Sequence, residues 1–396
     1  MTPFSARLPE ALAPNALARA VARLRAAGER FVDLTESNPT AVGFPAAPDQ
    51  LGALADPAAR CYQPEPLGLA SARESVSADY ARRGLAVNAD RIMLTASTSE
   101  AYAFLFKLLC NPGDAVLVPQ PSYPLFELLT RLEGIEAHPY RLEWHGAWSI
   151  DRETLVAALT PRTRAVLVVS PNNPTGSLLR ADDRDWLAGV CERHEMAMIG
   201  DEVFADYPLR PRPDGSPVLG DDRVLAFSLG GLSKSAGLPQ VKLGWLAAAG
   251  PARAVNHALA RLEVIADIYL SVSTPVQVAA PALIASGATT RAAIGRRLAR
   301  NLQQLRAKVA GCPPVSLLEP EGGWSAVLRV PATQSEEALV LRLLAEARVL
   351  VHPGYFFDFS QEAFLVVSLL PDPDQFAHGV DQVLGIAVGD GVRSEA

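Results

Sequence analysis

The chain has 396 residues, 49% of them apolar, and a formal net charge of −7 at pH 7. It contains no apolar stretch of membrane-spanning length, and its first residues lack the charged segment and apolar core of a signal peptide, so we expect a cytoplasmic protein. The acidic balance argues against a nucleic-acid partner, and the cysteines and histidines show neither disulfide nor metal-ligand spacing.

Between about residues 62 and 270, short apolar runs alternate with amphipathic stretches. This pattern is typical of an α/β protein whose mostly parallel sheet is covered by helices on both faces. The chain is longer than one typical core, so we predict a large domain over 46–280 and a smaller α+β domain formed by 1–45 and 281–396. Outside the alternating region we expect helices over 11–27, 277–310 and 336–347, and strands over 326–330 and 364–369.

Polar side chains follow the predicted strands of the alternating region. In chain order they are Ser97, Thr98, Ser99, Tyr123, Asn173, Asp201, Ser233 and Lys234. Ligands of open α/β sheets bind beyond the carboxyl ends of the strands. The pattern therefore predicts a single site that gathers these residues.

Lys234 is the most informative of them. It follows the apolar run 224–229 and a Gly-Gly pair that turns the chain. A lysine in this position can form a Schiff base with an aldehyde if its amine is partly deprotonated. Asp201 could keep the nitrogen of a pyridine ring protonated, and Asn173 could donate a hydrogen bond to a ring oxygen. These groups together predict pyridoxal 5′-phosphate as the cofactor.

The remaining polar residues suit the rest of that molecule. Ser97, Thr98 and Ser99 offer hydroxyls and backbone N–H groups to a phosphate at the start of a helix, and Lys242 could add a cation. Tyr123 could stack on the ring. Each residue also has an ordinary interpretation as a helix cap, a turn residue or a packing aromatic. Their occurrence together, in one order at strand ends, favours the site.

These segments resemble the fold-type I, class I and II pyridoxal-phosphate-dependent aminotransferases. The resemblance runs from 33–40 to 364–369, and its strongest parts are Asn172-Asn-Pro-Thr-Gly176, Asp201-Glu202, and Ser233-Lys234 followed by Gly237 and Lys242-Leu-Gly244. It implies a seven-stranded, mostly parallel sheet between helices. It also implies a homodimer in which Tyr62 reaches the phosphate of the other subunit. The implied reaction moves an amino group from an amino acid to a 2-oxo acid through a Lys234 Schiff base, in ping-pong half-reactions.

Three positions depart from the family pattern. Phe204 stands where most members have a tyrosine that donates to the ring oxygen, and Tyr207 is a candidate replacement. Lys242 stands where an arginine usually pairs with the phosphate, so the bidentate fork is lost. Val366 stands where the family places the arginine that binds the substrate carboxylate.

The loss at Val366 leaves three alternatives for the substrate. Its carboxylate could be bound by another cation, with Arg329 or His352 as candidates and Tyr355 nearby. It could be bound by backbone N–H groups near Ser37 and Asn38 together with Asn173. The substrate could also be an amine without that carboxylate, which would make the enzyme an amine transaminase. Alternative activities are those of a fold-type I lyase or decarboxylase, or of a regulatory module that binds the cofactor as a sensor.

Overall fold

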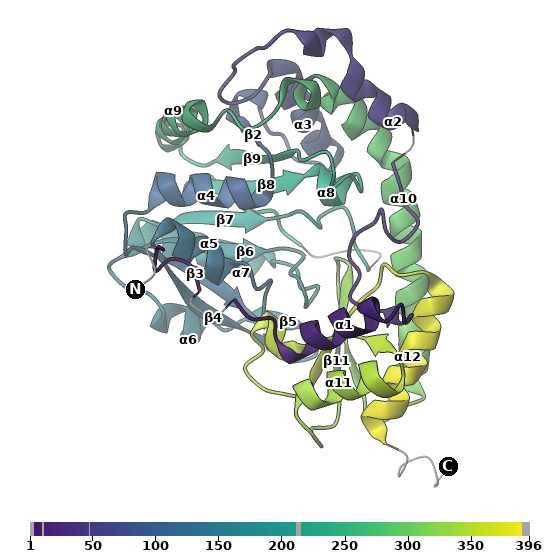
Figure 1. The fold of residues 1–396 in the computed structure, drawn as a ribbon. Coiled ribbons are helices and arrows are strands. Elements are labelled where there is room, and N and C mark those ends of the chain that lie inside the picture. Colours follow the sequence, from purple (N-terminus) through teal and green to yellow (C-terminus); the bar gives the residue numbers. More distant parts are fainter. Residues whose placement is uncertain (1–3, 10–11, 47, 211–214, 390–396) are drawn as a thin grey trace.

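The central feature of the computed structural model is a sheet of eight strands, in the order β2-β9-β8-β7-β6-β3-β4-β5, within the described residues 4–9, 12–46, 48–210 and 215–389 (Figure 1). All neighbouring strands are parallel except β5, paired with β4, and β9, paired with β8 and β2. The strands are β2 (Ile92–Thr95), β3 (Ala115–Gln120), β4 (Glu136–Trp144), β5 (Trp148–Ile150), β6 (Thr163–Val169), β7 (Ala197–Asp201), β8 (Ala226–Gly231) and β9 (Gly244–Ala249).

The sheet has one strand more than the seven we expected. The additional strand is β5, which has three residues and pairs with β4 after a turn at Gly146. Gly146 has a φ of 85°, a left-handed conformation that glycine adopts without strain. The α/β, mostly parallel architecture itself is confirmed.

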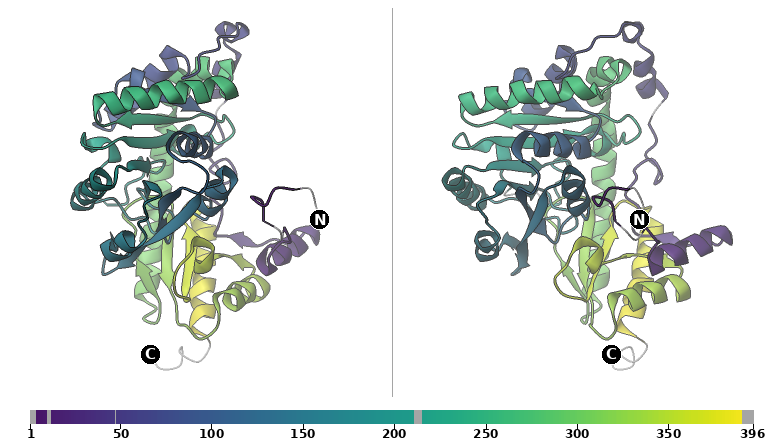
Figure 2. Two further views of the ribbon diagram at one scale, coloured as in Figure 1. Left: turned by 90° about the vertical axis from the view of Figure 1, so that its left-hand side faces the viewer. Right: turned by 60° about the vertical axis from the view of Figure 1, so that its left-hand side comes forward.

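Helices cover both faces of the sheet (Figure 2). Side chains of β6 alternate between two cores: Leu167 packs with α4, α5 and α9, whereas Val166 and Val168 pack with α7. Strands buried on both faces have the continuous apolar sequence seen here. The covering helices are α3 (Ala70–Arg82), α4 (Thr98–Leu109), α5 (Phe126–Glu133), α6 (Arg152–Ala157), α7 (Ala181–His194) and α9 (Ala252–Tyr269).

A second, four-stranded sheet has the order β10-β11-β14-β13 and is antiparallel throughout. A parallel two-stranded pair joins β1 near the N-terminus to β12. The strands are β1 (Val32–Asp33), β10 (Ser316–Leu318), β11 (Ser325–Arg329), β12 (Val349–Leu350), β13 (His352–Pro353) and β14 (Phe364–Ser368). Its apolar core also includes residues of α1 (Ala16–Ala26), α11 (Glu336–Glu346) and α12 (Pro373–Val388).

The long helix α10 (Thr274–Ala310) connects the two sheets. Its first half packs with α3 against the large sheet, and its second half packs with α12. The domain boundary expected at residue 280 therefore falls inside one continuous helix.

Two helices of the small unit differ in how well they were predicted. Helix α11 begins at Glu336, as expected, because Ser335 accepts a hydrogen bond from the N–H of Ala338. Helix α1 begins at Ala16, later than expected, because the Asn15 side chain caps it by accepting from the N–H of Ala18 at 2.8 Å. Residue 11, where we expected the helix to begin, lies outside the described residues.

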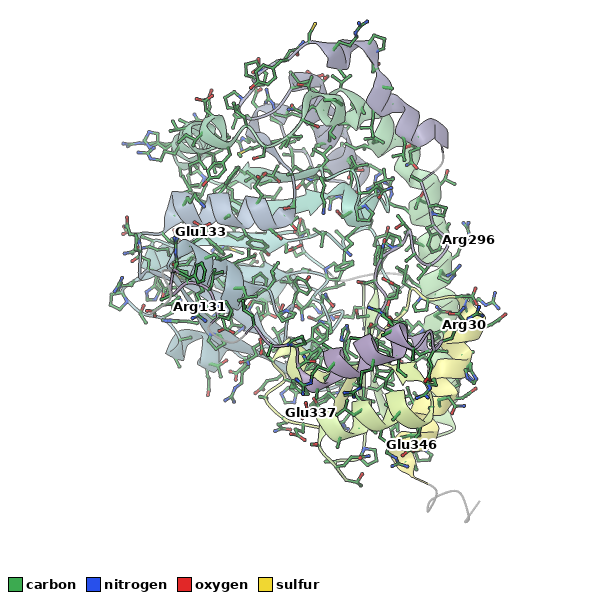
Figure 3. The ribbon with its side chains drawn as sticks, viewed as in Figure 1. Arg30, Arg131, Glu133, Arg296, Glu337 and Glu346 are labelled. Carbon is green, nitrogen blue, oxygen red and sulfur yellow. The ribbon has the colours of Figure 1, made fainter. Side chains whose placement is uncertain are left out.

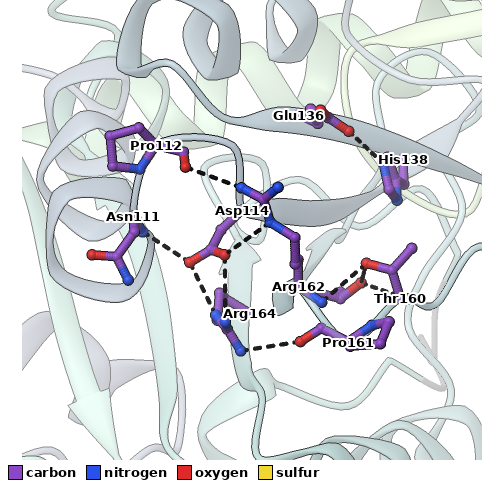
Figure 4. A network of polar contacts seen from close by, with 10 residues as sticks. Asn111, Pro112, Asp114, Glu136, His138, Thr160, Pro161, Arg162 and Arg164 are labelled. Carbon is purple, nitrogen blue, oxygen red and sulfur yellow. Dashed lines mark hydrogen bonds and ion pairs between the residues drawn. The ribbon is translucent and has the colours of Figure 1, made fainter.

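Charged side chains fix one of the loops between helix and strand (Figure 4). Asp114 accepts a hydrogen bond from the N–H of Asn111 and two from the guanidinium of Arg164. The Arg164 hydrogen bond is the main reason that the pKa of Asp114 lies below its usual value. The contact joins the residue before β3 to the start of β6, and so fixes these two neighbouring strands relative to each other.

Charges of both signs are interspersed on the outer helices. Figure 3 shows Arg131 and Glu133 together on α5, and Glu337 and Glu346 on α11. Glu133 forms an ion pair with Lys107 of the neighbouring α4, at 2.6 Å. None of the helices in the described ranges is long and apolar enough to cross a membrane.

Candidate active site

A cavity of about 340 Å³ opens at the carboxyl ends of the central strands. The structure brings most of the predicted site residues to its wall. These are Ser37, Ser97, Thr98, Ser99, Tyr123, Asn173, Asp201, Phe204, Ser233 and Lys234. They come from six segments that are far apart in the sequence, and the strand order of the sheet is what makes them neighbours.

Lys234 lies on the single helical turn α8 (Leu232–Ser235), directly after β8. Two hydrogen bonds hold this turn: the Tyr207 hydroxyl donates to the Lys234 carbonyl at 2.6 Å, and the Ser235 hydroxyl donates to the Gly231 carbonyl at 3.0 Å. Gly230, near the end of β8, must lack a side chain, because a β-carbon there would lie 2.5 Å from the indole nitrogen of Trp245. The backbone of Lys234 is therefore fixed while its amine points to the cavity wall.

The surroundings of the Lys234 amine favour its neutral form. It lies 4.7 Å from the ring centre of Trp324 and 5.5 Å from that of Phe204. Burial lowers its pKa from 10.5 to about 8, although the nearby charges of Asp201 and Glu36 act in the opposite direction. A substantial neutral fraction near neutral pH is the condition for a lysine to act as a nucleophile or base.

Asp201 ends β7 and lies half-buried on the wall of the cavity. Its carboxylate accepts hydrogen bonds from the N–H of Val203 and from the Tyr102 hydroxyl, both at 3.2 Å. Burial raises its pKa to about 6, and those two hydrogen bonds partly oppose the increase. A carboxylate this deep is stabilised by a positive partner, as a protonated ring nitrogen would be.

Sequence reasoning missed Tyr102 as a site residue. It lines the cavity and orients Asp201 through its hydroxyl. A signal was present: Tyr102 follows Thr98 by four residues on a helix, so the two share a face.

Asn173 lies on a turn whose geometry depends on its neighbour Asn172. The Asn172 side chain is buried and donates to the Pro121 carbonyl and the Thr175 hydroxyl, and it accepts from Ser122. Asn173 is thereby directed into the cavity, where its amide oxygen accepts a hydrogen bond from Ser325 at 3.3 Å. Ser325 and Trp324 come from the second sheet, and sequence reasoning had not assigned them to the site.

The start of α4 lies at one end of the cavity and has the features of an anion-binding helix terminus. The hydroxyl of Ser97 caps the helix by accepting from the N–H of Glu100, and Glu100 in turn accepts from the N–H of Ala96. Thr98 and Ser99 thus bring their hydroxyls and N–H groups to the cavity at the positive end of a 12-residue helix. Gly244 faces this turn so closely that a β-carbon there would lie 3.0 Å from the carbonyl carbon of Ser97.

These groups fit pyridoxal phosphate. The cavity offers a buried amine for its aldehyde, a carboxylate for its ring nitrogen and a helix start for its phosphate. Tyr123 is half-exposed on the wall, where an aromatic ring could stack, while Phe204 is buried and packs edge-on against Trp324. Phe204 has no hydroxyl, and that of Tyr207 is used by the Lys234 carbonyl.

Five predicted residues do not line this cavity. Lys242 is exposed, with a φ of 62°, and Asn38 uses its side chain to accept from Thr40. Tyr62 is 71% exposed and lines another cavity, beside the ends of α9 and α10. His352 and Tyr355 belong to the second sheet and the turn that follows it.

The position of the absent carboxylate-binding arginine is filled by an apolar cluster. Val366 is 2% exposed and packs with Trp148, Leu318, Val327 and Phe357. His352 is its cross-strand neighbour, and burial lowers the pKa of that histidine.

Arg329 is exposed at the end of β11. Within the described parts of the chain, no arginine lines the cavity. Neither Arg329 nor His352 is therefore among the residues that line the cavity.

The sequence model of the family described as aminotransferase class I and II matches residues 33–383. The chain belongs to this family. Among its relatives, the glutamate-pyruvate aminotransferase AlaA of Escherichia coli is 27% identical over 366 residues, which are 89% of each chain. The arginine–pyruvate transaminase AruH of Pseudomonas aeruginosa is 28% identical over 309 residues, 76% of each.

Solved structures show the same fold. An aminotransferase from Escherichia coli superposes with a TM-score of 0.87 at 23% identity, covering 98% of this chain and 99% of the other. An alanine aminotransferase from Pyrococcus furiosus gives 0.82 at 24% identity, covering 93% and 95%.

The protein is thus a pyridoxal-phosphate-dependent aminotransferase of fold type I, and the predictions of fold class, cofactor and transferase activity are confirmed. The comparisons give no support to the lyase, decarboxylase or amine-transaminase alternatives.

Proposed function

We propose that this enzyme moves an amino group from an amino acid to a 2-oxo acid, with Lys234 as the residue that binds the cofactor and transfers the proton. The observation that carries the proposal is the buried amine of Lys234, with a pKa lowered to about 8, in one cavity with the carboxylate of Asp201. Both relatives described above carry pyruvate in their names, so pyruvate is the first acceptor to test.

When bound, pyridoxal phosphate supplies an aldehyde for a covalent bond and a ring that accepts electrons. Lys234 would hold the cofactor through its aldehyde, and its amine is the group in the cavity that would accept the proton from the substrate carbon and return it. Asp201 would hold a proton at the ring nitrogen, and the Tyr102 hydroxyl keeps that carboxylate in position. Asn173 would bind the ring oxygen, and Tyr123 would stack on the ring.

The phosphate is bound by the start of α4 and by neighbouring groups. Ser97, Thr98, Ser99 and Ser233 contribute from the cavity wall, and Lys242 adds a cation from outside it. Tyr62 of the partner subunit completes the site in a homodimer. Its exposed ring supports this role, because a tyrosine that is 71% exposed has little to pack against within its own chain.

For the substrate carboxylate, Ser37 and Asn173 are the better-placed candidates, because both line the cavity. The N–H of Asn38 already donates to Glu36 at 2.7 Å. His352, in the second sheet, and Tyr355, in the turn that follows it, remain candidates that do not line the cavity.

We further propose a cytoplasmic enzyme with a large domain over 46–280 and a small domain over 1–45 and 281–396. Four free cysteines fit a reducing compartment.

The test uses the purified holoenzyme and a panel of amino acids without any acceptor. We expect the visible band of the bound cofactor to disappear as one equivalent of 2-oxo acid forms, and pyruvate to restore the band. The Lys234→Ala variant should show neither change. Normal turnover of Lys234→Ala would refute the assignment, and a persistent band with product accumulation would refute amino transfer.

A further inference from the structure

Glu36 lies on a bridge, residues 34–39, that passes the active-site cavity at Ser37. On one side the bridge is anchored at Leu34, which is fully buried and donates its N–H to the Leu350 carbonyl at 2.9 Å. The Leu34 carbonyl accepts from the N–H of Ser368 at 2.6 Å. On the other side Pro39 is buried next to Gly237, and Gly237 follows Lys234 by three residues. A β-carbon built on Gly237 would lie 3.8 Å from the β-carbon of Pro39. The short segment between these anchors is therefore fixed in space.

The side chain of Glu36 is held in place but keeps its charge available. One carboxylate oxygen accepts a hydrogen bond from the N–H of Asn38 at 2.7 Å. No ion pair of Glu36 occurs with any residue that the structure describes. The negative charge is also close enough to Lys234 to act on the pKa of its amine. Ser37, the next residue, lines the cavity.

Among the described residues, the cavity wall offers an acidic substrate no cation other than Lys234. Its charged wall residues in the described chain are Asp201 and Lys234, and both have roles toward the cofactor. The position of the family arginine is taken by Val366 within an apolar cluster. An additional carboxylate on the substrate would therefore meet Glu36 with like charge, whereas a cation would meet an unpaired partner.

We propose that Glu36 selects amino donors that carry a second positive charge, an ammonium or guanidinium group, a few bonds from the amine that reacts. This inference rests on the proposed function and deepens it. The shared chemistry is that of basic amino acids and of diamines. Because the carboxylate of Glu36 is held by Asn38, it meets that cation without a large ordering cost.

The experiment compares matched donors in the holoenzyme with pyruvate as acceptor. Arginine is set against citrulline, and lysine against norleucine, because each pair has similar size and differs in side-chain charge. A charge-assisted contact should favour the cationic member by about ten- to a hundredfold in kcat/KM. Putrescine and cadaverine form the second arm: turnover of these diamines in preference to lysine would identify the diamine as the source of the cation.

The Glu36→Gln variant keeps an oxygen for the Asn38 N–H and removes the charge, so the preference should fall to within about threefold of unity if the contact supplies it. Glu36→Arg should reverse it and favour glutamate. The control is Glu192→Gln, an exposed residue of α7, which should leave the preference unchanged. A binding measurement independent of turnover uses α-methylornithine and α-methylnorvaline, which have no α-proton, by calorimetry.

The outcomes separate this inference from the proposed function. Equal use of arginine and citrulline, or a preference that persists in Glu36→Gln, overturns the role of Glu36 while leaving aminotransfer intact. Loss of the preference in Glu192→Gln overturns it as well. No 2-oxo acid from any donor would instead refute the proposed function.

Discussion

The protonation of Lys234 can be tested in the cofactor-free protein. Only the neutral amine reacts with trinitrobenzenesulfonate, so its modification rate should rise with pH with a midpoint of about 8, well below the ordinary lysine value of 10.5. The physical cause is burial, which disfavours the charged form. The rate is measured by mass spectrometry of the peptide that contains Lys234.

A change at Asp201 gives the sign of the electrostatic effect on this lysine. The negative charge of Asp201 raises the pKa of Lys234 and so opposes burial. In Asp201→Asn that opposition is gone, and the midpoint should move below 8. A midpoint that rises in this variant would show that the two groups do not interact as the structure indicates.

At the scale of elements, Gly244 allows β9 to approach the start of α4. A β-carbon at this position would lie 3.0 Å from the carbonyl carbon and 3.2 Å from the α-carbon of Ser97, and these are backbone atoms that cannot rotate away. Gly244→Ala should displace the turn that we propose to bind the phosphate, at a cost of about 1–3 kcal/mol, which corresponds to about five- to 150-fold weaker cofactor binding. The measurement is fluorescence titration of the cofactor-free enzyme.

The matched control is Gly295→Ala in the middle of α10, where a β-carbon has open space. It should leave cofactor binding unchanged and stabilise the helix by about 0.5–1 kcal/mol. Equal cofactor affinity in Gly244→Ala and in the parent enzyme would contradict the close approach.

Strand β14 shows why restoring the family arginine should fail. In Val366→Arg the guanidinium would enter the cluster formed by Trp148, Val327 and Phe357, none of which can pair with its charge. We expect a loss of about 3–5 kcal/mol in the free energy of unfolding and no gain in kcat/KM for neutral amino acids. Urea unfolding measures the free energy of unfolding. The control is Val366→Leu, which changes the size of the side chain without adding a charge. An active, stable Val366→Arg enzyme would mean that Trp148 moves aside readily.

The sequence predicted those parts of the site that depend on local order along the chain. Asp201 and Lys234 were identified because each follows its own apolar strand, and the edge where parallel strands end is common to the fold. Trp324 and Ser325 were missed because they reach the cavity from the second sheet. The packing that brings them there, such as the contact of Gly322 with Pro171, leaves no periodic signal. The short strand β5 was missed because three residues are too few to show alternation.

At the scale of the whole molecule, exposed apolar side chains gather around one cavity. Tyr62 and Leu270 line it together, and Tyr269 beside them packs against Phe104. Val264 and Ile268 are exposed on the same helix α9, which ends at Tyr269. Large exposed apolar residues that cluster on a protein surface commonly mark an interaction site. This surface includes Tyr62, the residue proposed to reach the phosphate of the other subunit.

Ile268, which is 75% exposed, therefore gives a direct test of the homodimer. A carboxylate there would have to be buried without a partner on association, so Ile268→Glu should yield a monomer of half the mass by light scattering. Its cofactor affinity should fall as well, because Tyr62 of the partner subunit would no longer reach the phosphate. Val156→Glu on α6 changes another exposed apolar residue and should remain dimeric. Dimeric Ile268→Glu with normal cofactor binding would place the subunit contact elsewhere, whereas a monomer that binds the cofactor normally would remove Tyr62 from the site.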